Sequence, residues 1–369
     1  MERITTLAFS LILYRRWCIF LTLFSISETT NRHELLMRLS WRQLIRSKLR
    51  GKSSYFSIGI AFSGESVMLC ALQKEGDELK WVLDASFSHT NWQSQLAEYV
   101  KRHKLGNTDC YVSLTSHCYQ LLQLDQPKVP EDEIYAAIAW PLNDLLPPNT
   151  KYVYDYLNPP AQAAGQSKLS VVAIPHKDIE RISKGIYNAE LTLKNISIEE
   201  TASVELTPES DDAVMSLVQE HGEEIVLNIV KGNQLYFTRR LKGFENLGSY
   251  SEKELSMGIT ESLCVQIQRS MDYFESQLRQ SPVRKVLLKL DTPLADELAN
   301  QIQGNMGLPV NPFEPLIICG SGFNFKMASF SCLGAAYIKH ANAAQSHLKT
   351  KPAKDKAASS GASSAEVSS

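Results

Sequence analysis

Three short runs of alternating apolar and polar residues open the regular part of this chain, and small-residue turns separate them. The alternation predicts strands at Tyr55–Phe62, Glu65–Gln73 and Leu79–Phe87. An amphipathic helix is expected next at Trp92–His103, followed by an apolar strand at Cys110–Leu114. The first half therefore predicts a hairpin meander followed by a helix and a further strand.

The second half of the chain repeats this order. A hairpin is predicted at Ile225–Val230 and Gln234–Leu241, and an apolar stripe with a nearly four-residue step predicts a long helix at Ser251–Arg279. A strand at Val283–Leu290 and a helix at Pro293–Met306 are expected to follow. Two copies of this plan are typical of an α/β fold made of two ribonuclease-H-like lobes. A cleft between the lobes is the expected place for a ligand.

Residues 127–206 interrupt the repeat and predict a small α/β insert subdomain. A helix is expected at Glu131–Leu145, and Pro141 should bend it because proline removes one backbone hydrogen bond. The other predicted elements of the insert lie at Tyr152–Leu157, Lys168–Ile174, Lys177–Ala189 and Leu193–Ile198. The two lobes are accordingly expected at residues 53–126 and 207–341.

The two ends of the chain differ from this body. Two apolar runs within residues 1–36 are separated by Arg15 and Arg16, which disfavour a single membrane-spanning helix through both runs. This leader is expected to be either a signal-like segment or a stretch upstream of a true start at Met37, so it does not enter the fold prediction. Residues 342–369 are rich in Ala, Ser and Lys, which predicts a disordered tail.

Residues 37–52 carry cations without any acid, together with apolar residues at helical spacing. The cations are Arg38, Arg42, Arg46, Lys48, Arg50 and Lys52, and the apolar residues are Trp41, Leu44, Ile45 and Leu49. The pattern predicts a short basic amphipathic helix suited to an anionic membrane surface or an acidic partner. A solvated helix at the domain edge is the alternative. The candidate contact residues of this segment are Arg38, Trp41, Arg42 and Arg46.

Composition narrows the function classes. The chain has 369 residues, more than one simple core usually holds, so two domains or subdomains are expected. Its net charge of −2 gives no whole-molecule attraction to nucleic acid. Seven cysteines without a Cys-x-x-Cys pair argue against a zinc site and favour a reducing compartment. His117 and Cys118 are neighbours on a predicted strand and should point to opposite faces, which argues against a catalytic Cys–His pair.

Two motifs in this chain resemble the PilM family of type IV pilus assembly proteins. The first is a strand, a proline and an acidic helix start, then a helix, a second proline and an Asp-Tyr strand, over residues 121–134, 137–140, 145–147 and 154–156. The second is Ile-Gln-Arg-Ser-Met-Asp-Tyr-Phe-Glu-Ser at 267–276. The resemblance covers roughly residues 53–340. It implies an actin-like ATPase fold, a place at the cytoplasmic face of the bacterial inner membrane, and binding to the cytoplasmic tail of a PilN-like partner.

An actin-type ATPase needs an aspartate in each phosphate loop, to hold hydrated magnesium and to orient the attacking water. The first family motif, Gly-Ile-Asp-Ile-Gly, is matched here by residues 59–63, so Ala61 stands where the aspartate is expected. At the second loop the nearest match is Asn228. The residues 288–291 offer no glycine pair for an adenosine. All three differences predict a degenerate nucleotide site.

The residues of this degenerate loop would be Gly59, Ser63, Gly64, Ser66 and Asn228. The backbone around Ser63 and Gly64 could donate to a phosphate, although Glu65 would place negative charge beside it. A plain hairpin turn is the favoured interpretation. The sequence therefore predicts no ATP hydrolysis, no metal site and no cofactor, with residual ATP binding as the alternative.

The function predicted from the sequence is a non-catalytic cytoplasmic scaffold of a pilus assembly machine. Tyr135 and Trp140 are candidate partner contacts, because aromatic side chains dominate interface hot spots. The alternative is an actin-like ATP-binding protein or ATPase of the pilus or of the type II secretion inner-membrane platform. Such an ATPase would have to use displaced acids such as Asp84, Glu261 or Asp291.

Overall fold

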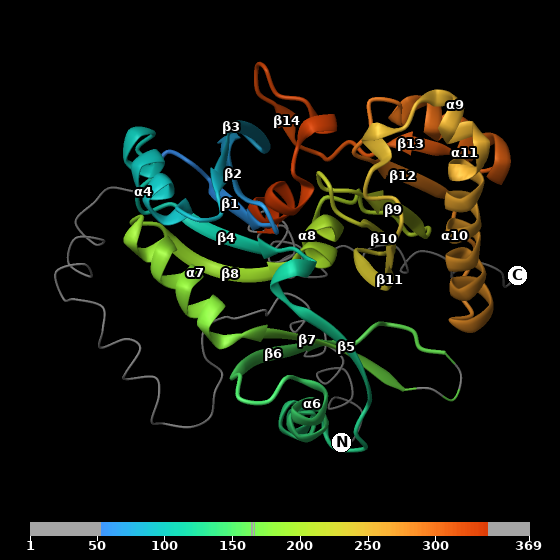
Figure 1. Ribbon diagram of the computed structural model, residues 1–369, viewed down its shortest axis with the longest axis horizontal. Helices are drawn as coiled ribbons and strands as arrows, with labels where there is room; N and C mark the ends of the chain where they lie inside the picture. Colours follow the sequence, from blue (N-terminus) through green and yellow to red (C-terminus); the bar gives the residue numbers. More distant parts are fainter. Residues whose placement is uncertain (1–52, 164, 166, 339–369) are drawn as a thin grey trace, which may run out of the picture.

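The computed structural model describes residues 53–163, 165 and 167–338. The leader at 1–36, the basic segment at 37–52 and the tail at 342–369 lie outside the described residues, so the expectations for them stay predictions. Within the described part of the chain, no helix is both long enough and apolar enough to cross a membrane. Figure 1 shows two lobes side by side and a smaller subdomain beneath them.

The first lobe is built on a six-stranded sheet with the order β14-β3-β2-β1-β4-β8. Its strands are β1 (Ser57–Phe62), β2 (Ser66–Glu75), β3 (Glu78–Ser88), β4 (Asp109–Leu114), β8 (Thr192–Ile198) and β14 (Ile318–Cys319). β1 pairs antiparallel with β2 and parallel with β4. The helices of this lobe are α4 (Trp92–Arg102) and α7 (His176–Asn188). The strands and the helix predicted between residues 55 and 114 are confirmed to within two residues at each end.

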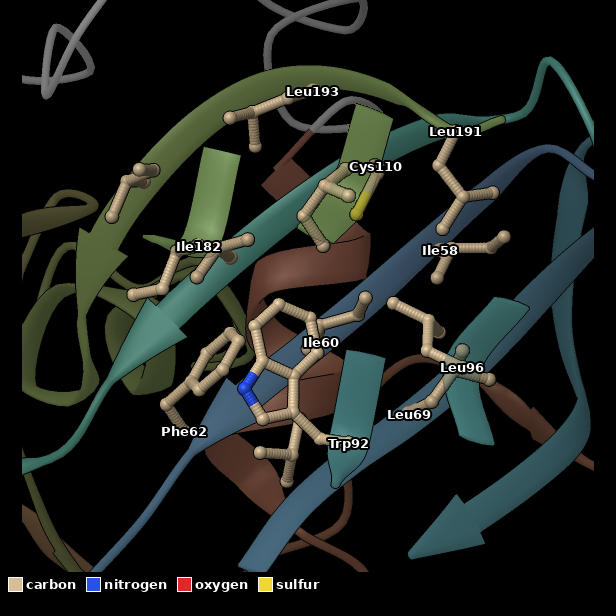
Figure 2. Packing of buried hydrophobic residues seen from close by; sticks show 14 of the residues in the cluster. Ile58, Ile60, Phe62, Leu69, Trp92, Leu96, Cys110, Ile182, Leu191 and Leu193 are labelled. Carbon is tan, nitrogen blue, oxygen red and sulfur yellow. The ribbon is translucent and has the colours of Figure 1, made fainter. Parts of the chain in front are cut away.

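The two faces of β1 pack against different layers. On one face, shown in Figure 2, Trp92 of α4 meets Phe62 edge-on with ring centroids 4.9 Å apart, in a core that also includes residues of α7. On the other face, a Cβ at Gly59 would lie 1.9 Å from the carbonyl oxygen of Cys332, which belongs to the helical residues 330–338. Gly59 is therefore required for a close approach of strand and helix.

The second lobe repeats the strand order of the first. Its five-stranded sheet runs β11-β10-β9-β12-β13. The strands are β9 (Val214–Val218), β10 (Ile225–Lys231), β11 (Gln234–Leu241), β12 (Lys285–Lys289) and β13 (Val310–Pro312). The sequence pattern did not predict β9, the central strand, because it is a short run buried at every position and shows no alternation. The sequence had placed the hairpin β10–β11 at the start of this lobe. These strands are in fact its second and third strands.

The long helix predicted at Ser251–Arg279 is interrupted. It consists of α9 (Glu252–Glu254), a π-helical segment, α10 (Thr260–Asp272) and a second π-helical segment. The first interruption contains Gly258 at φ +123°, which breaks the helical backbone. The predicted apolar stripe still faces the core, because Leu255, Leu263, Ile267, Met271, Phe274 and Leu278 are buried. The next helix, α11 (Ala295–Met306), begins two residues later than predicted.

The insert is a three-stranded sheet with the order β5-β7-β6, and it is smaller than predicted. Its elements are β5 (Gln120–Asp125), α5 (Ile134–Ala137), α6 (Ala139–Leu145), β6 (Tyr152–Leu157) and β7 (Lys168–Pro175). The helix predicted at Glu131–Leu145 is divided near Ile138, because Pro141 has no N–H for the carbonyl one turn before it.

Three predicted domain boundaries are corrected by the sheet pairing. β5 was assigned to the first lobe but pairs with β7 in the insert. β8 was assigned to the insert but pairs with β4 in the first lobe, and α8 (Glu199–Glu205) follows it directly. At the C-terminal end, β14 pairs with β3, so the chain returns from the second lobe to the first. These boundaries depend on long-range pairing, which the local pattern does not contain.

Candidate functional site at the interface of the two lobes

The cleft predicted between the lobes corresponds to a place where the lobes contact each other. The β1–β2 turn (63–65) and the β9–β10 loop (219–224) approach the same side chain, His117. His117 belongs to a 3₁₀ turn after β4, although the sequence had suggested a strand at this position. A Cβ at Gly64 would lie 3.1 Å from its ring, and its Nε2 lies 2.9 Å from Glu223 Oε2. His117 thus joins the two lobes.

The turn of the first lobe is closed by hydrogen bonds between Ser63 and Ser66. The Ser63 N–H donates to the Ser66 carbonyl at 3.0 Å, and Ser63 Oγ accepts the Ser66 N–H at 3.1 Å. Ala61, at the end of the preceding strand, is buried and offers no ligand atom. The candidate residues Ser63, Gly64 and Ser66 therefore lie together in one tight hairpin turn.

The loop of the second lobe is held by two further carboxylates besides Glu223. Glu220 Oε1 accepts the Ser331 N–H at 2.8 Å, which ties the loop to the helical residues 330–338 of the first lobe. Asp291 Oδ2 accepts the Gly222 N–H at 3.2 Å and lies 2.9 Å from His221 Nδ1. This loop is therefore fixed by contacts with three different parts of the chain.

Gln219 stands directly after β9, where a second phosphate loop would begin. Its side chain is fully buried and donates to two backbone carbonyls of its own lobe at 2.8 and 3.0 Å. Asn228, which the sequence suggested for this position, lies within β10 and donates to the Glu200 carbonyl at 3.0 Å and to Ser203 Oγ at 2.9 Å. The assignment of Asn228 to the loop is wrong, because the strand that precedes the loop had been missed.

Arg240 of β11 brings a positive charge to this interface. Its Nη2 donates to Glu199 Oε1 at 2.5 Å and to Glu200 Oε1 at 2.7 Å, both at the start of α8. It also donates to the Tyr119 hydroxyl at 2.7 Å. Glu199 Oε1 additionally accepts the Ser116 N–H at 2.9 Å. Both carboxyl groups are almost completely buried.

One cation therefore faces two buried carboxyl groups. Burial raises the pKa of Glu199 to about 8; Arg240 opposes this rise, and Glu200 adds to it. Burial disfavours the charge of Arg240, but the neighbouring Glu200, Tyr119 and Glu199 outweigh this effect, so the pKa of Arg240 is raised. The arginine stays charged, and Glu199 keeps a raised proton affinity.

These contacts decide whether a magnesium nucleotide suits this place. Backbone N–H groups can bind a phosphate only when they are free to donate. The N–H groups of Ser116, Gly222 and Ser331 already donate to the carboxylates described above. Among the residues that the structure describes, no group of three or more His, Cys, Asp or Glu side chains is arranged to hold a metal ion. These three N–H groups are therefore not free to bind a phosphate.

The displaced acids of the ATPase alternative are not brought together. Asp84 lies on β3, where its carbonyl accepts a hydrogen bond from Tyr99 of α4, and Glu261 is exposed in the first turn of α10. Asp291 alone of the three borders the second-lobe loop. Arg240, Glu199 and Glu200, by contrast, were not singled out from the sequence. An acidic pair such as Glu199 and Glu200 at a helix start is ordinarily explained by the helix dipole.

The candidate partner contacts lie on the insert. Tyr135 of α5 stacks on Tyr154 of β6 with ring centroids 4.6 Å apart and remains 43% exposed. Trp140 of α6 is 83% exposed, and Leu145 on the same helix is 53% exposed. Large exposed apolar side chains of this kind mark candidate contact surfaces. The remaining candidates, Arg38, Trp41, Arg42 and Arg46, lie outside the described residues.

No protein-family model and no curated protein sequence matches this chain. Its fold is similar to that of a chain in the PilM–PilN type IV pilus biogenesis complex, with a TM-score of 0.55, 15% identity, and coverage of 77% of this chain and 98% of that chain. The cytoplasmic domain of EpsL, an inner-membrane component of the type II secretion system of Vibrio cholerae, has a TM-score of 0.43 at 10% identity, covering 80% and 95%. A Bacteroides thetaiotaomicron protein with an actin-like ATPase fold and unknown function has a TM-score of 0.42 at 10% identity, covering 70% and 90%.

Identities this low concern the fold and not the function. The strand order repeated in both lobes agrees with the similarity, and together they confirm the predicted actin-like fold. The chain is a duplicated ribonuclease-H-like α/β structure with a small insert.

Proposed function

We propose that this protein is a non-catalytic cytoplasmic scaffold of a type IV pilus assembly machine, at the inner face of the bacterial inner membrane. In this proposal it binds the cytoplasmic tail of a PilN-like inner-membrane partner, and the pilus is of the MSHA type. The observation that carries the proposal is the fold similarity to a chain of the PilM–PilN complex, which extends over 98% of that chain. The two family-like motifs at residues 121–156 and 267–276 support it.

The absence of catalysis is proposed from the chemistry of the two central loops. Ala61 occupies the place where the aspartate of the first phosphate loop is expected, and Gln219 begins the second loop; neither side chain can supply a carboxylate for hydrated magnesium. The N–H groups of Ser116, Gly222 and Ser331 are already bonded to carboxylates of the protein. A phosphate at these groups would have to displace internal hydrogen bonds and approach buried carboxyl groups.

The partner surface is proposed from the helices of the insert, which cover the face of its sheet that is turned away from the first lobe. Trp140 of α6 is 83% exposed. Leu145 on the same helix and Tyr135 on α5 are also exposed. An apolar segment of the partner tail would bury these side chains, and a central aromatic anchor usually dominates such binding. The basic segment at 37–52 would add contact with anionic lipid, and Arg42→Glu with Arg46→Glu tests that addition through association with anionic vesicles.

The proposal is tested by calorimetry on the full chain, titrated with Mg-ATP and with a synthetic cytoplasmic peptide of the PilN-like partner. The expected result is heat from the peptide, no heat from the nucleotide, and binding at least about tenfold weaker in Trp140→Ala. Met327→Ala is the matched control, because Met327 is also 83% exposed but lies outside the insert. Tight Mg-ATP binding, or turnover abolished by Asp291→Asn, would instead establish the ATPase alternative.

A further inference from the structure

Two neighbouring arginines on β11 point to opposite sides of their strand and serve different lobes. Arg239 Nη2 donates to Gln266 of α10 at 2.8 Å, inside the second lobe. Arg240 Nη2 donates across the interface, to Glu199 and Glu200 of α8 and to the Tyr119 hydroxyl. The alternation of side chains along a strand accounts for this division.

The contacts of Arg240 are almost closed to solvent. The arginine side chain is 16% exposed, and the carboxyl-bearing side chains of Glu199 and Glu200 are 4% and 1% exposed. Charges in such surroundings are screened little by salt, and separating them would leave buried groups without partners. The lobes therefore resist opening at this point, because opening would expose these charges to water or leave them without partners.

Two further contacts cross the same interface and add to this resistance. His117 lies 2.9 Å from Glu223, although the histidine side chain is 58% exposed and water can compete for it. Glu220 of the second lobe accepts the buried N–H of Ser331 at 2.8 Å. Of these bridges, Arg240 is the one that brings a charged side chain to several acceptors, and both of its carboxyl acceptors are buried.

We propose that Arg240 is an internal latch, which holds the two lobes closed without any bound nucleotide. In the actin-like arrangement a magnesium nucleotide would lie between the lobes and link them through its charges. Here the guanidinium is the cation between the lobes, and the carboxyl groups of Glu199 and Glu200 are its acceptors. The interface is consequently preformed, and the scaffold presents one fixed lobe arrangement to its partners. This inference concerns the lobe interface and holds whatever partner the insert binds.

The test compares the full chain with Arg240→Met and with Arg239→Met as the matched control on the same strand. Hydrogen exchange is followed by mass spectrometry, with and without Mg-ATP, and the radius of gyration by X-ray scattering. We expect Arg240→Met to raise amide exchange at 116–119 and 219–224 by about tenfold or more and to enlarge the particle. Arg239→Met should affect α10 and β11 and leave the interface protected. Wild-type protection should not change with Mg-ATP.

A second variant distinguishes latch loss from failure to fold. Glu199→Gln with Glu200→Gln keeps the side-chain shapes and leaves no carboxylate beside Arg240, so the variant removes the latch without leaving a buried carboxylate unpaired. The latch predicts faster exchange at 116–119 and 219–224 in this variant, with the protection of β9 and β12 retained. Unchanged interface exchange in both variants overturns the proposal. Wild-type protection that appears only with Mg-ATP overturns it as well.

Discussion

The two lobes share a strand order but complete their central turns differently. In the first lobe Ser63 follows β1, and the turn closes on Ser66 through hydrogen bonds within the turn. In the second lobe Gln219 follows β9, and the loop is bonded to separate elements through Glu220 and by Asp291. One turn is therefore a local structure, whereas the other depends on tertiary contacts.

The two lobes therefore share a backbone plan but differ in the residues that follow their central strands, β1 and β9. The buried strands of both lobes need apolar residues to pack. The order β3-β2-β1-β4-β8 in the first lobe accordingly matches β11-β10-β9-β12-β13 in the second. The residues after β1 and β9 lie outside that requirement. They form a serine turn in one lobe and a carboxylate-bonded loop in the other.

Gly59→Ala is expected to have the largest effect, because it alters the strand that leads into the first turn. The added methyl group would lie 1.9 Å from the Cys332 carbonyl oxygen and 3.0 Å from the Ala336 backbone nitrogen. We expect the free energy of unfolding to fall by about 3 kcal/mol, measured by urea denaturation. Gly304→Ala in α11 is the control, since its Cβ meets open space and should stabilise by up to about 1 kcal/mol. An unchanged urea midpoint in Gly59→Ala would contradict the packing argument.

Glu199→Gln tests the contact between the two lobes through the pH dependence of the free energy of unfolding. The pKa of Glu199 rises on folding from its ordinary 4.5 to about 8, so the folded protein binds this proton more tightly than the unfolded chain. The resulting stabilisation is present below about pH 4.5 and is lost as the pH rises to about 8, at up to about 1.4 kcal/mol per pH unit. Glu199→Gln should flatten this decline in denaturation curves recorded across that range. Glu98→Gln, at an exposed ion pair with Arg102, should keep the wild-type slope.

Asp291→Ala and Ser63→Ala compare the two turns directly, with the smallest expected effects. Loss of the Asp291 carboxylate removes the acceptor of the Gly222 N–H, so we expect a loss of about 1 kcal/mol and faster amide exchange in 219–224. Ser63→Ala removes the hydrogen bonds that the Ser63 hydroxyl makes with Ser66 in an exposed turn and should cost about 0.5 kcal/mol, without any change at 219–224. If both variants altered the exchange of both turns equally, the turns would not be independent.

Much of the fold was predictable, but the candidate site was not. Periodicity located the hairpins and the insert strands β6 and β7, because alternation is a local signal. It missed β9, which is buried at every position and shows no alternation, and this omission displaced the second loop onto Asn228. It also joined α9 and α10 across Gly258, since an apolar stripe continues through a break that only the backbone reveals.

The sequence by itself determined the type and order of most elements, because these depend on the pattern of neighbouring residues. It also showed that alanine, and not aspartate, stands at position 61. The tertiary structure alone decided that Arg240 meets Tyr119, Glu199 and Glu200. These partners lie 121, 41 and 40 residues away along the chain. No local pattern marks such a meeting, since it requires two separate sheets to form and their edges to be brought together. The chemistry between the lobes is for that reason a property of the folded chain.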